Sequence, residues 1–295
     1  MTDSAEQRLR RIAESSSYLL AEEDIQLLKQ DELRPVRMQL ELLKPEMILA
    51  ANKIHSTIVV FGGTRIVERA EAEAELAELE RSLAAAPDDA QLLRTQARLQ
   101  RQLAKCKYYD DAREFGRLVS TECQIDDKCD HVIVTGGGPG IMEAANRGAF
   151  DVGAKSVGLN ITLPHEQEPN SYITPELCFL FRYFAMRKLH FLMRAKALVI
   201  FPGGFGTLDE MFDALTLRQT NRMQKIPIIL YSRDYWSRVI DFQFLADEGV
   251  IDDEDLQLIQ YAETPSEAWR IVREFDATGE ARLPLEEPTN DKPTG

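Results

Sequence analysis

Short runs of apolar residues recur along the second half of the chain, and most are followed by a segment with apolar residues at helical spacing. The runs are apolar almost without interruption, which is typical of parallel strands that helices cover on both faces. The predicted strands are 57–63, 131–138, 156–161, 178–181, 197–204 and 226–231. The pattern therefore predicts an α/β fold, a Rossmann-like doubly wound parallel sheet.

The first 56 residues follow a different pattern. Residues 5–50 are rich in Glu, Gln, Leu and Arg, and apolar positions such as Ile25 and Leu28 recur at helical spacing, with prolines as interruptions. We expect two or three helices outside the sheet, as an N-terminal extension over 1–56. The main domain is predicted over 57–276, and 277–295 has so little to bury that we expect a flexible tail.

Residues 67–116 interrupt the main domain after its first strand. The composition shifts to Ala, Glu, Leu, Arg and Gln, and "AAAPDDAQ" breaks the segment near its middle. This pattern predicts an inserted helical hairpin with leucines along an antiparallel seam. We interpret the hairpin as a structural or dimer-forming arm, and partner binding is the alternative.

Charge and cysteine content narrow the function. The formal net charge is −14 and no dense Lys/Arg run occurs, which argues against binding to nucleic acid or anionic membranes. The four cysteines form neither a disulfide framework nor a CxxC metal motif. The N-terminus is too charged for a signal peptide, and no apolar run is long enough to span a bilayer. We expect a soluble, cytoplasmic protein that uses no metal or cofactor.

Three glycine-rich segments follow predicted strands: "FGGTR" at 61–65, "TGGGPGIMEAANRGA" at 135–149 and "FPGGFGTLDE" at 201–210. At the carboxyl ends of parallel strands, such turns let backbone N–H groups approach an anion, although many serve only tight packing. None is followed by the Lys-Ser/Thr pair of a P-loop, and "GGGPG" lacks the GxGxxG spacing of dinucleotide sites. A monophosphate is the anion that fits best.

Two charged residues are of interest near the last of these segments, Glu210 at its end and Arg187 before it. In "GTLDE", Thr207 and Glu210 have the spacing of a capping box, with Thr207 as the N-cap, and Glu210 would then also lie beside the phosphate loop. Arg187 belongs to a polar stripe on the helix predicted before that loop. An arginine there is often merely solvated or salt-bridged, so its significance comes from its neighbours.

Together, "TGGGPGIMEAANRGA", the Arg-Lys pair at 187–188 and "PGGFGTLDE" resemble the LOG family, the nucleoside 5'-monophosphate phosphoribohydrolases, whose signature is an Arg-Lys pair followed by PGGxGTxxE. Many members carry the older label "lysine decarboxylase". The resemblance covers about 57–64 and 117–275, while the N-terminal helices and the hairpin resemble the longer bacterial branch. "FAMRK" departs from the MHxRK of short members, which leaves the base specificity open.

The resemblance implies a reaction and its residues. The family hydrolyses the N-glycosidic bond of a nucleoside monophosphate to free base and ribose 5-phosphate, with Arg187 and Glu210 as the catalytic pair. Family members place the site at a dimer interface, so we expect at least a homodimer with the helix at 182–195 near it. The residues implied in binding the substrate are Thr64, Gly136, Gly137, Gly138, Gly140, Gly203, Gly204, Gly206 and Thr207.

Other functions remain open at this stage. Lysine decarboxylation would need a Schiff-base lysine beside pyridoxal phosphate, and neither Lys188 nor Lys196 has the expected surroundings. A carrier or sensor could use the same loops without chemistry. AMP is the simplest substrate and N6-prenylated AMP the alternative. His190 is a candidate for the acid that protonates the leaving base, although a packed or exposed histidine is the commoner case.

Overall fold

The computed structural model describes residues 4–124, 129–163 and 168–277. The chain divides into two compact units, one ending at Met47 and one beginning at Ile48. This division precedes the predicted boundary at residue 57, because Leu49 is already buried in the core of the second unit. The predicted tail lies almost wholly outside the described residues.

The first unit is helical. It contains α1 (Ala5–Ala13), the short helices η1 (Ser16–Tyr18), α2 (Ile25–Leu28) and η2 (Asp31–Leu33), and most of α3 (Arg34–Ala51). Ser4 begins α1 with a capping box, in which its side chain accepts a hydrogen bond from Gln7 N and the Gln7 side chain accepts one from Ser4 N. The α1, α2, η1 and η2 helices bury no residue, so few tertiary contacts hold this unit.

In the described part of the second unit, seven parallel strands form one sheet in the order β4-β3-β2-β1-β5-β6-β7. The predicted Rossmann-like fold is confirmed. The strands are β1 (Thr57–Phe61), β2 (Val132–Thr135), β3 (Ser156–Ile161), β4 (Cys178–Phe181), β5 (Ala195–Ile200), β6 (Ile228–Tyr231) and β7 (Ile259–Ala262). The pattern missed β7, a half-buried edge strand with a polar residue inside it, and it extended β1, β2 and β5 into their glycine turns.

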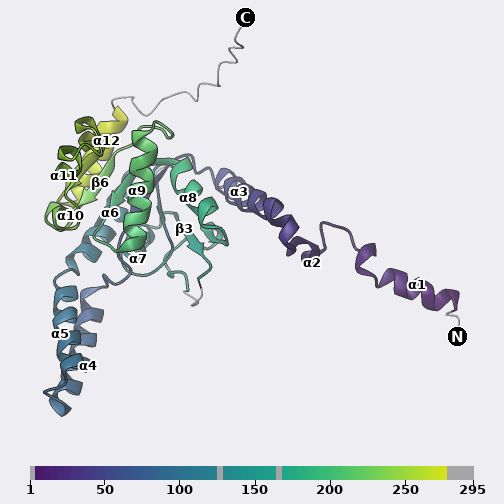
Figure 1. Cartoon of the computed structure of the whole chain (residues 1–295), viewed down its shortest axis with the longest axis horizontal. Helices are drawn as coiled ribbons and strands as arrows, with labels where there is room; N and C mark the ends of the chain where they lie inside the picture. Colours follow the sequence, from purple (N-terminus) through teal and green to yellow (C-terminus); the bar gives the residue numbers. More distant parts are fainter. Residues whose placement is uncertain (1–3, 125–128, 164–167, 278–295) are drawn as a thin grey trace, which may run out of the picture. The chain divides into compact units, whose positions relative to one another are not determined.

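Helices cover both faces of the sheet (Figure 1). One face packs against α8 (Phe184–Met193), α9 (Phe205–Gln219), α10 (Arg233–Val239) and α11 (Phe242–Asp247), and the other against α6 (Lys107–Cys123), α7 (Ile141–Phe150) and α12 (Pro265–Ala277). Two apolar cores result, one on each side of strands such as β1, where Val59 faces the first and Ile58 the second. This double burial explains why the strands are continuously apolar.

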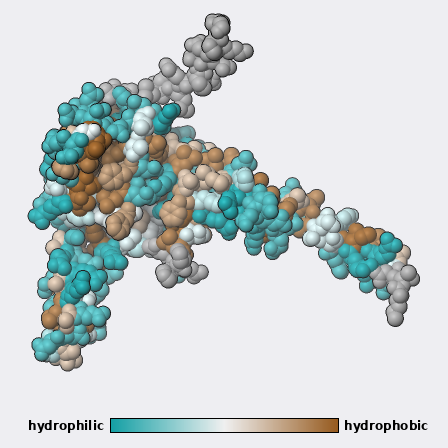
Figure 2. All heavy atoms as spheres, in the orientation of Figure 1, coloured by the Kyte–Doolittle hydropathy of each residue, from teal (hydrophilic) through white to brown (hydrophobic). Residues whose placement is uncertain are grey.

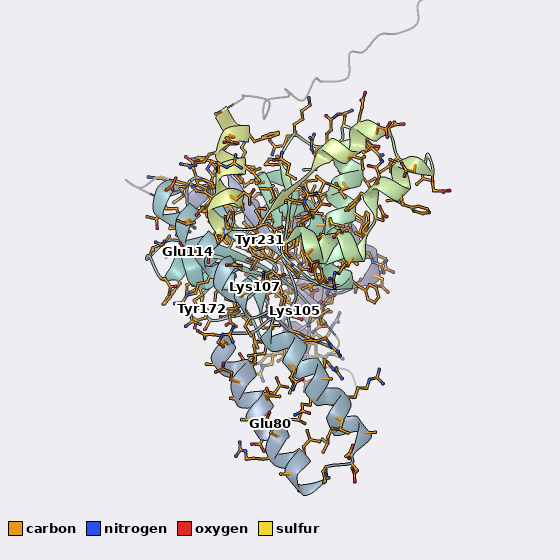
Figure 3. All side chains as sticks on the ribbon, turned by 90° about the vertical axis from the view of Figure 1, so that its left-hand side faces the viewer. Glu80, Lys105, Lys107, Glu114, Tyr172 and Tyr231 are labelled. Carbon is orange, nitrogen blue, oxygen red and sulfur yellow. The ribbon has the colours of Figure 1, made fainter. Side chains whose placement is uncertain are left out.

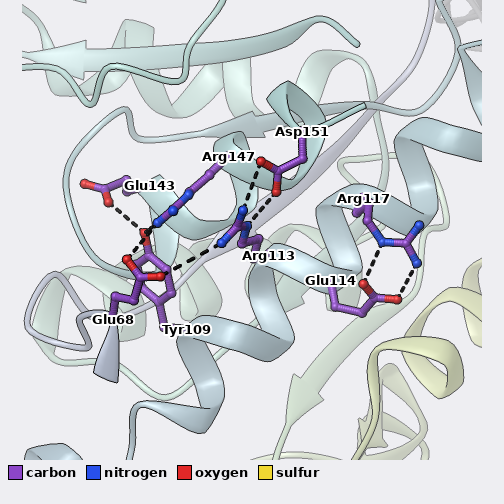
Figure 4. Close-up of polar contacts among 8 residues, drawn as sticks. All are labelled: Glu68, Tyr109, Arg113, Glu114, Arg117, Glu143, Arg147 and Asp151. Atoms are coloured by element: carbon purple, nitrogen blue, oxygen red, sulfur yellow. Dashed lines mark hydrogen bonds and ion pairs between the residues drawn. The ribbon is translucent and has the colours of Figure 1, made fainter. Parts of the chain in front are cut away.

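The α6 and α7 helices pack very closely. A Cβ atom at Gly116 would collide with the carbonyl oxygen of Ala145, and one at Gly148 with the carbonyl oxygen of Arg113. Polar contacts surround this seam in Figure 4, where the Tyr109 hydroxyl donates to the Glu143 carboxylate at 2.7 Å. The α7 helix, which begins at the glycine loop after β2, is therefore held firmly against α6.

The hairpin of α4 (Arg69–Ala85) and α5 (Ala90–Leu103) extends away from the sheet (Figure 1). Most of its leucines are partly or fully buried, with Leu83 and Leu99 the most enclosed, whereas Leu93 is exposed. The predicted insertion, 67–116, runs past this hairpin into α6. Phe115 and its neighbours in α6 are buried against the sheet, so that part of the segment belongs to the core.

An ion pair links His131, the residue before β2, to α12. The Nε2 atom of His131 lies 2.6 Å from a carboxylate oxygen of Asp276, and the His131 ring contacts Trp269 edge to face. Burial alone would lower the pKa of His131, but the hydrogen bonds with Asp276 and Cys123 raise it to about 9. At neutral pH, His131 is therefore a cation that ties α12 to the sheet.

This ion pair predicts a pH-dependent stability. The folded-state pKa of His131 lies above its unfolded value, so the stabilisation is complete below about pH 6.5 and is lost as the pH rises through about 9. Replacing His131→Gln should lower the free energy of unfolding by up to about 3 kcal/mol at pH 6 and by much less at pH 9.5. Urea unfolding at both pH values measures the difference. The exposed control His55→Gln should change neither value, and an equal loss from His131→Gln at both would contradict the prediction.

Candidate active site

The strand order reverses between β1 and β5, and the glycine loops meet at the carboxyl ends of these strands. The backbone N–H of Gly63 donates to the carbonyl of Pro202 at 2.9 Å, and the N–H of Ile141 donates to the carbonyl of Gly63 at 3.2 Å. Gly140 has a φ of 74°, and a Cβ there would collide with Gly63 and Thr64. The three loops are therefore in direct contact, at the position where open α/β sheets bind ligands.

The loop after β2 is held by buried asparagines. The N–H of Gly137 donates to the hydroxyl of Thr135 at 3.0 Å, and the backbone N–H of Asn170 donates to the carbonyl of Gly137 at 2.9 Å. The side chain of Asn170 also donates to the carbonyl of Gly138 at 3.1 Å and to the side chain of Asn146 at 3.0 Å. Sequence reasoning missed both asparagines. A polar residue at 146 on the buried face of α7 was the available signal.

The α9 helix begins earlier than its sequence indicated. Gly204 is the N-cap and Thr207 is the third helical residue, so the predicted capping box of Thr207 and Glu210 is wrong. The turn at Gly203 and Gly204 reverses the chain sooner, and the buried Thr207 side chain packs directly over Gly203, where a Cβ would collide with it. The first N–H groups of any helix lack acceptors within the helix, and in α9 no side chain caps them.

The residues at the start of α9 are exposed. A Cβ at Gly204 or at Gly206 would meet no atom within 4 Å, and Phe205 between them is 92% exposed. A helix of 15 residues has a partial positive charge at its N-terminus, which favours an anion there. The start of α9 can therefore bind a phosphate group through backbone donors alone.

Arg187 lies on α8 beside the loop after β2. Its Nε atom donates to the carbonyl of Leu159 at 2.7 Å, its Nη2 atom lies 3.4 Å from the carbonyl of Gly136, and its guanidinium lies over the ring of Phe191 at 5.0 Å. Burial lowers the pKa of Arg187, and the charge of Glu210 opposes this shift. These contacts fix the cation in place, so it is not a freely solvated surface arginine.

Glu210 lies on α9 near that cation. Burial raises the pKa of its carboxyl group to about 7, although Lys188 and Arg187 lower it, and the nearby Asp209 and Asp213 add to the rise. Lys188 itself pairs with Asp209 at 2.9 Å. A carboxyl group whose pKa is near neutrality, beside a fixed arginine, is typical of catalytic sites.

The structure thus brings the predicted residues together in groups. Arg187 approaches Gly136, Thr207 covers Gly203, and Thr64 adjoins Gly140. Gly136, Gly137, Gly138, Gly140 and Thr207 are buried, and the N–H of Gly137 already donates within its loop. The predicted binding residues that are exposed are Thr64, Gly204 and Gly206.

The stretch of the chain that holds these residues is similar to known proteins. A family model described as "Possible lysine decarboxylase" matches residues 142–272, which include α8, the β5–α9 loop and Glu210. The chain is 26% identical over 176 residues to cytokinin riboside 5'-monophosphate phosphoribohydrolase LOG3 of Arabidopsis thaliana, a match that covers 58% of this chain and 77% of the relative. LOG4 of the same plant is 26% identical over 181 residues, covering 60% and 80%.

Solved structures also resemble this chain. The X-ray structure of TM1055, a structural genomics target, aligns with 74% of this chain and 99% of its own, at 21% identity and a TM-score of 0.44. The strand order and the glycine loops define a Rossmann-like α/β protein with its loops gathered at the switch point. Within that class, the family model and the two plant relatives confirm the resemblance to the LOG family.

Among the described residues, no helix combines the length and the apolar character needed to cross a bilayer. No three His, Cys, Asp or Glu side chains within 4–124, 129–163 and 168–277 gather in a way that could hold a metal ion.

Glu210 should reduce the stability of the fold. Its folded pKa of about 7 exceeds the ordinary value of 4.5, so stability is lost as the pH rises between these values and stays lower above them. Glu210→Gln should therefore raise the free energy of unfolding by about 1–3 kcal/mol at pH 8 and leave it nearly unchanged at pH 4. Denaturant unfolding tests this, with the exposed Glu248→Gln as control. A loss of stability at pH 8 would refute it.

Proposed function

We propose that the protein hydrolyses the N-glycosidic bond of a purine nucleoside 5'-monophosphate, releasing free base and ribose 5-phosphate. The observation that carries this proposal is the partly buried Glu210 carboxyl, with its pKa near 7, between the fixed Arg187 cation and the accessible start of α9. The names of the two plant relatives describe a reaction of this class.

The geometry supports distinct tasks for each part of the site. The N–H groups at the start of α9 and the Thr207 hydroxyl bind the 5'-phosphate. Binding of this remote group places the C1' atom of the ribose near Glu210, which accelerates the reaction by fixing the reacting centre. Arg187 keeps its charge beside Glu210 and orients the sugar or the phosphate.

Glu210 acts at the reacting centre. As the bond between C1' and the base nitrogen breaks, positive charge develops on the ribose, and the ionised carboxylate stabilises it. The same carboxylate orients a water molecule and accepts its proton as the water oxygen bonds to C1'. General-base assistance of this kind contributes roughly 10²–10⁴-fold in rate. The leaving base takes up a proton from solvent, and Glu210 returns to solvent the proton that it accepted from the water. His190 is buried against Phe181, which supports a packing role for it rather than that of the acid.

The substrate and assembly follow from further observations. AMP is the simplest substrate, and N6-prenylated AMP is the alternative that the plant relatives' names support. Large apolar side chains are exposed on β4, α8 and α9 beside the site, and Figure 2 shows hydrophobic surface over α8 and α9. They are Leu180, Phe184, Leu189, Met193, Phe205 and Phe212. We infer that a second copy of the chain covers this face, which makes the enzyme at least a homodimer.

The remaining aspects are consistent with this function. Lys188 is paired with Asp209 and Asp213, which does not favour it as a Schiff-base lysine for decarboxylation. All four cysteines are free.

Activity on a defined set of substrates tests the proposal. Purified protein should release base and ribose 5-phosphate from AMP or from N6-isopentenyl-AMP, but not from adenosine, because adenosine lacks the phosphate that positions C1'. Glu210→Gln should reduce the rate roughly 10²–10⁴-fold. Chromatography of both products measures this, with Glu248→Gln as the matched control. If no base appears while AMP still raises the melting temperature, the protein is a carrier or sensor and the proposal is wrong.

The pH profile provides an independent test of Glu210. Since its carboxylate is the active form, kcat/KM should rise about tenfold per pH unit up to about pH 7 and level off above it. Asp209→Asn removes a negative neighbour and releases Lys188, and both changes lower the pKa of Glu210. The acidic limb should therefore move to lower pH in this variant. A limb that stays at the same pH would assign it to a different group.

A further inference from the structure

Two adjacent aromatic residues of α10 hold the β5–α9 loop from inside the protein. The Tyr235 hydroxyl donates to the carbonyl of Gly203 at 2.6 Å, and the Trp236 indole N–H donates to the carbonyl of Ile200 at 3.2 Å. Their rings meet edge to face at 5.2 Å, and Trp236 is completely buried. The loop is thus hydrogen bonded near its start and near its end by one rigid element.

The contact at Gly203 fixes a whole peptide group. In a trans peptide, the carbonyl of one residue and the N–H of the next point in opposite directions. All described peptide bonds here are trans. Because the Gly203 carbonyl points toward Tyr235, the N–H of Gly204 points away from it. Gly204 itself is exposed, and a Cβ there would meet no atom within 4 Å.

This orientation would otherwise be poorly determined. Gly203 and Gly204 both lack the side chain that restricts backbone rotation, and a two-glycine segment has more conformations to lose than any other dipeptide. A hydrogen bond to a fixed phenol removes that freedom before a ligand arrives, and such preorganisation lowers the free-energy cost of binding. Burial also raises the pKa of Tyr235, so its hydroxyl remains a donor over the whole physiological range.

We propose that Tyr235 is a positioning residue for the phosphate site: its hydrogen bond to Gly203 aims the Gly204 N–H at the 5'-phosphate of the substrate. The inference rests on the proposed function and extends it. Tyr235 itself touches the loop from behind, so it acts on the ligand only through the Gly203–Gly204 peptide.

The root of the α4–α5 hairpin also contacts Tyr235. The ammonium group of Lys105 lies 5.8 Å from the centre of the Tyr235 ring, and Figure 3 shows Lys105 where the hairpin joins the sheet domain. The side chain of Gln102 also approaches the carbonyl of Arg65, in the loop after β1, at 3.4 Å. Tyr235 is therefore in contact with both the hairpin root and the phosphate loop.

Ligand binding separates this role from a merely structural one. Isothermal titration of the full-length protein with AMP and with ribose 5-phosphate would be compared for wild type and Tyr235→Phe. Loss of one hydrogen bond that positions a donor should weaken both ligands about 5- to 10-fold. For AMP, KM should rise and kcat should also fall, so that kcat/KM falls by at least this factor, because the phosphate contact places C1' of the ribose near Glu210.

The matched control is Tyr109→Phe, which removes a buried phenol hydroxyl that donates to Glu143 in α7 and not to the β5–α9 loop. It should leave the affinity for both ligands unchanged. Tyr235→Leu removes the ring as well as the hydroxyl, so it should lower the melting temperature more than Tyr235→Phe yet weaken the ligands by a similar factor. If the loss of affinity instead follows the loss of stability across the three variants, the positioning role is wrong.

The two proposals fail in different ways. If wild type binds AMP and Tyr235→Phe binds it equally well, the proposed function survives and the role of Tyr235 is refuted. If wild type binds neither AMP nor ribose 5-phosphate, the phosphate site itself is refuted, and the positioning role with it.

Discussion

The parallel pairing of β1 with β5 is the contact on which the site depends. It continues past the strands, where the N–H of Gly63 donates to the carbonyl of Pro202, and it brings the first and last glycine loops side by side although about 140 residues separate them in the chain. The loop after β2 joins them because Gly140 can approach Gly63 without a Cβ. Each loop is therefore placed by the backbone of another.

A conflict between stability and function is concentrated on α9. No side chain caps its N-terminus, and Glu210 is enclosed enough for its pKa to rise to about 7. Both features cost folding free energy, and both suit the reaction proposed above. The surrounding helices offset this cost, since Arg187 and the α10 aromatics hold the neighbouring backbone by hydrogen bonds.

The segment inserted after β1, from α4 to α6, packs in two different ways. The α4–α5 hairpin extends from the sheet, whereas α6, which follows it directly, forms part of the core through its close packing with α7. Gln102 places the hairpin root beside the loop after β1, and Lys105 lies over the ring of Tyr235, which donates to the β5–α9 loop. An insertion in such a position can influence the site mechanically without contributing a side chain to it.

The sequence by itself determined the sheet, its parallel character and the identity of the glycine loops, because continuous apolar runs and glycine turns are local properties of the chain. It also singled out Arg187 and Glu210 through their motif. Only the tertiary structure decided that α9 begins at Phe205 rather than after Thr207, since the packing of Thr207 on Gly203 competes with local capping. The roles of Asn146, Asn170 and Tyr235 likewise depend on partners distant in sequence, and no local pattern encodes those contacts.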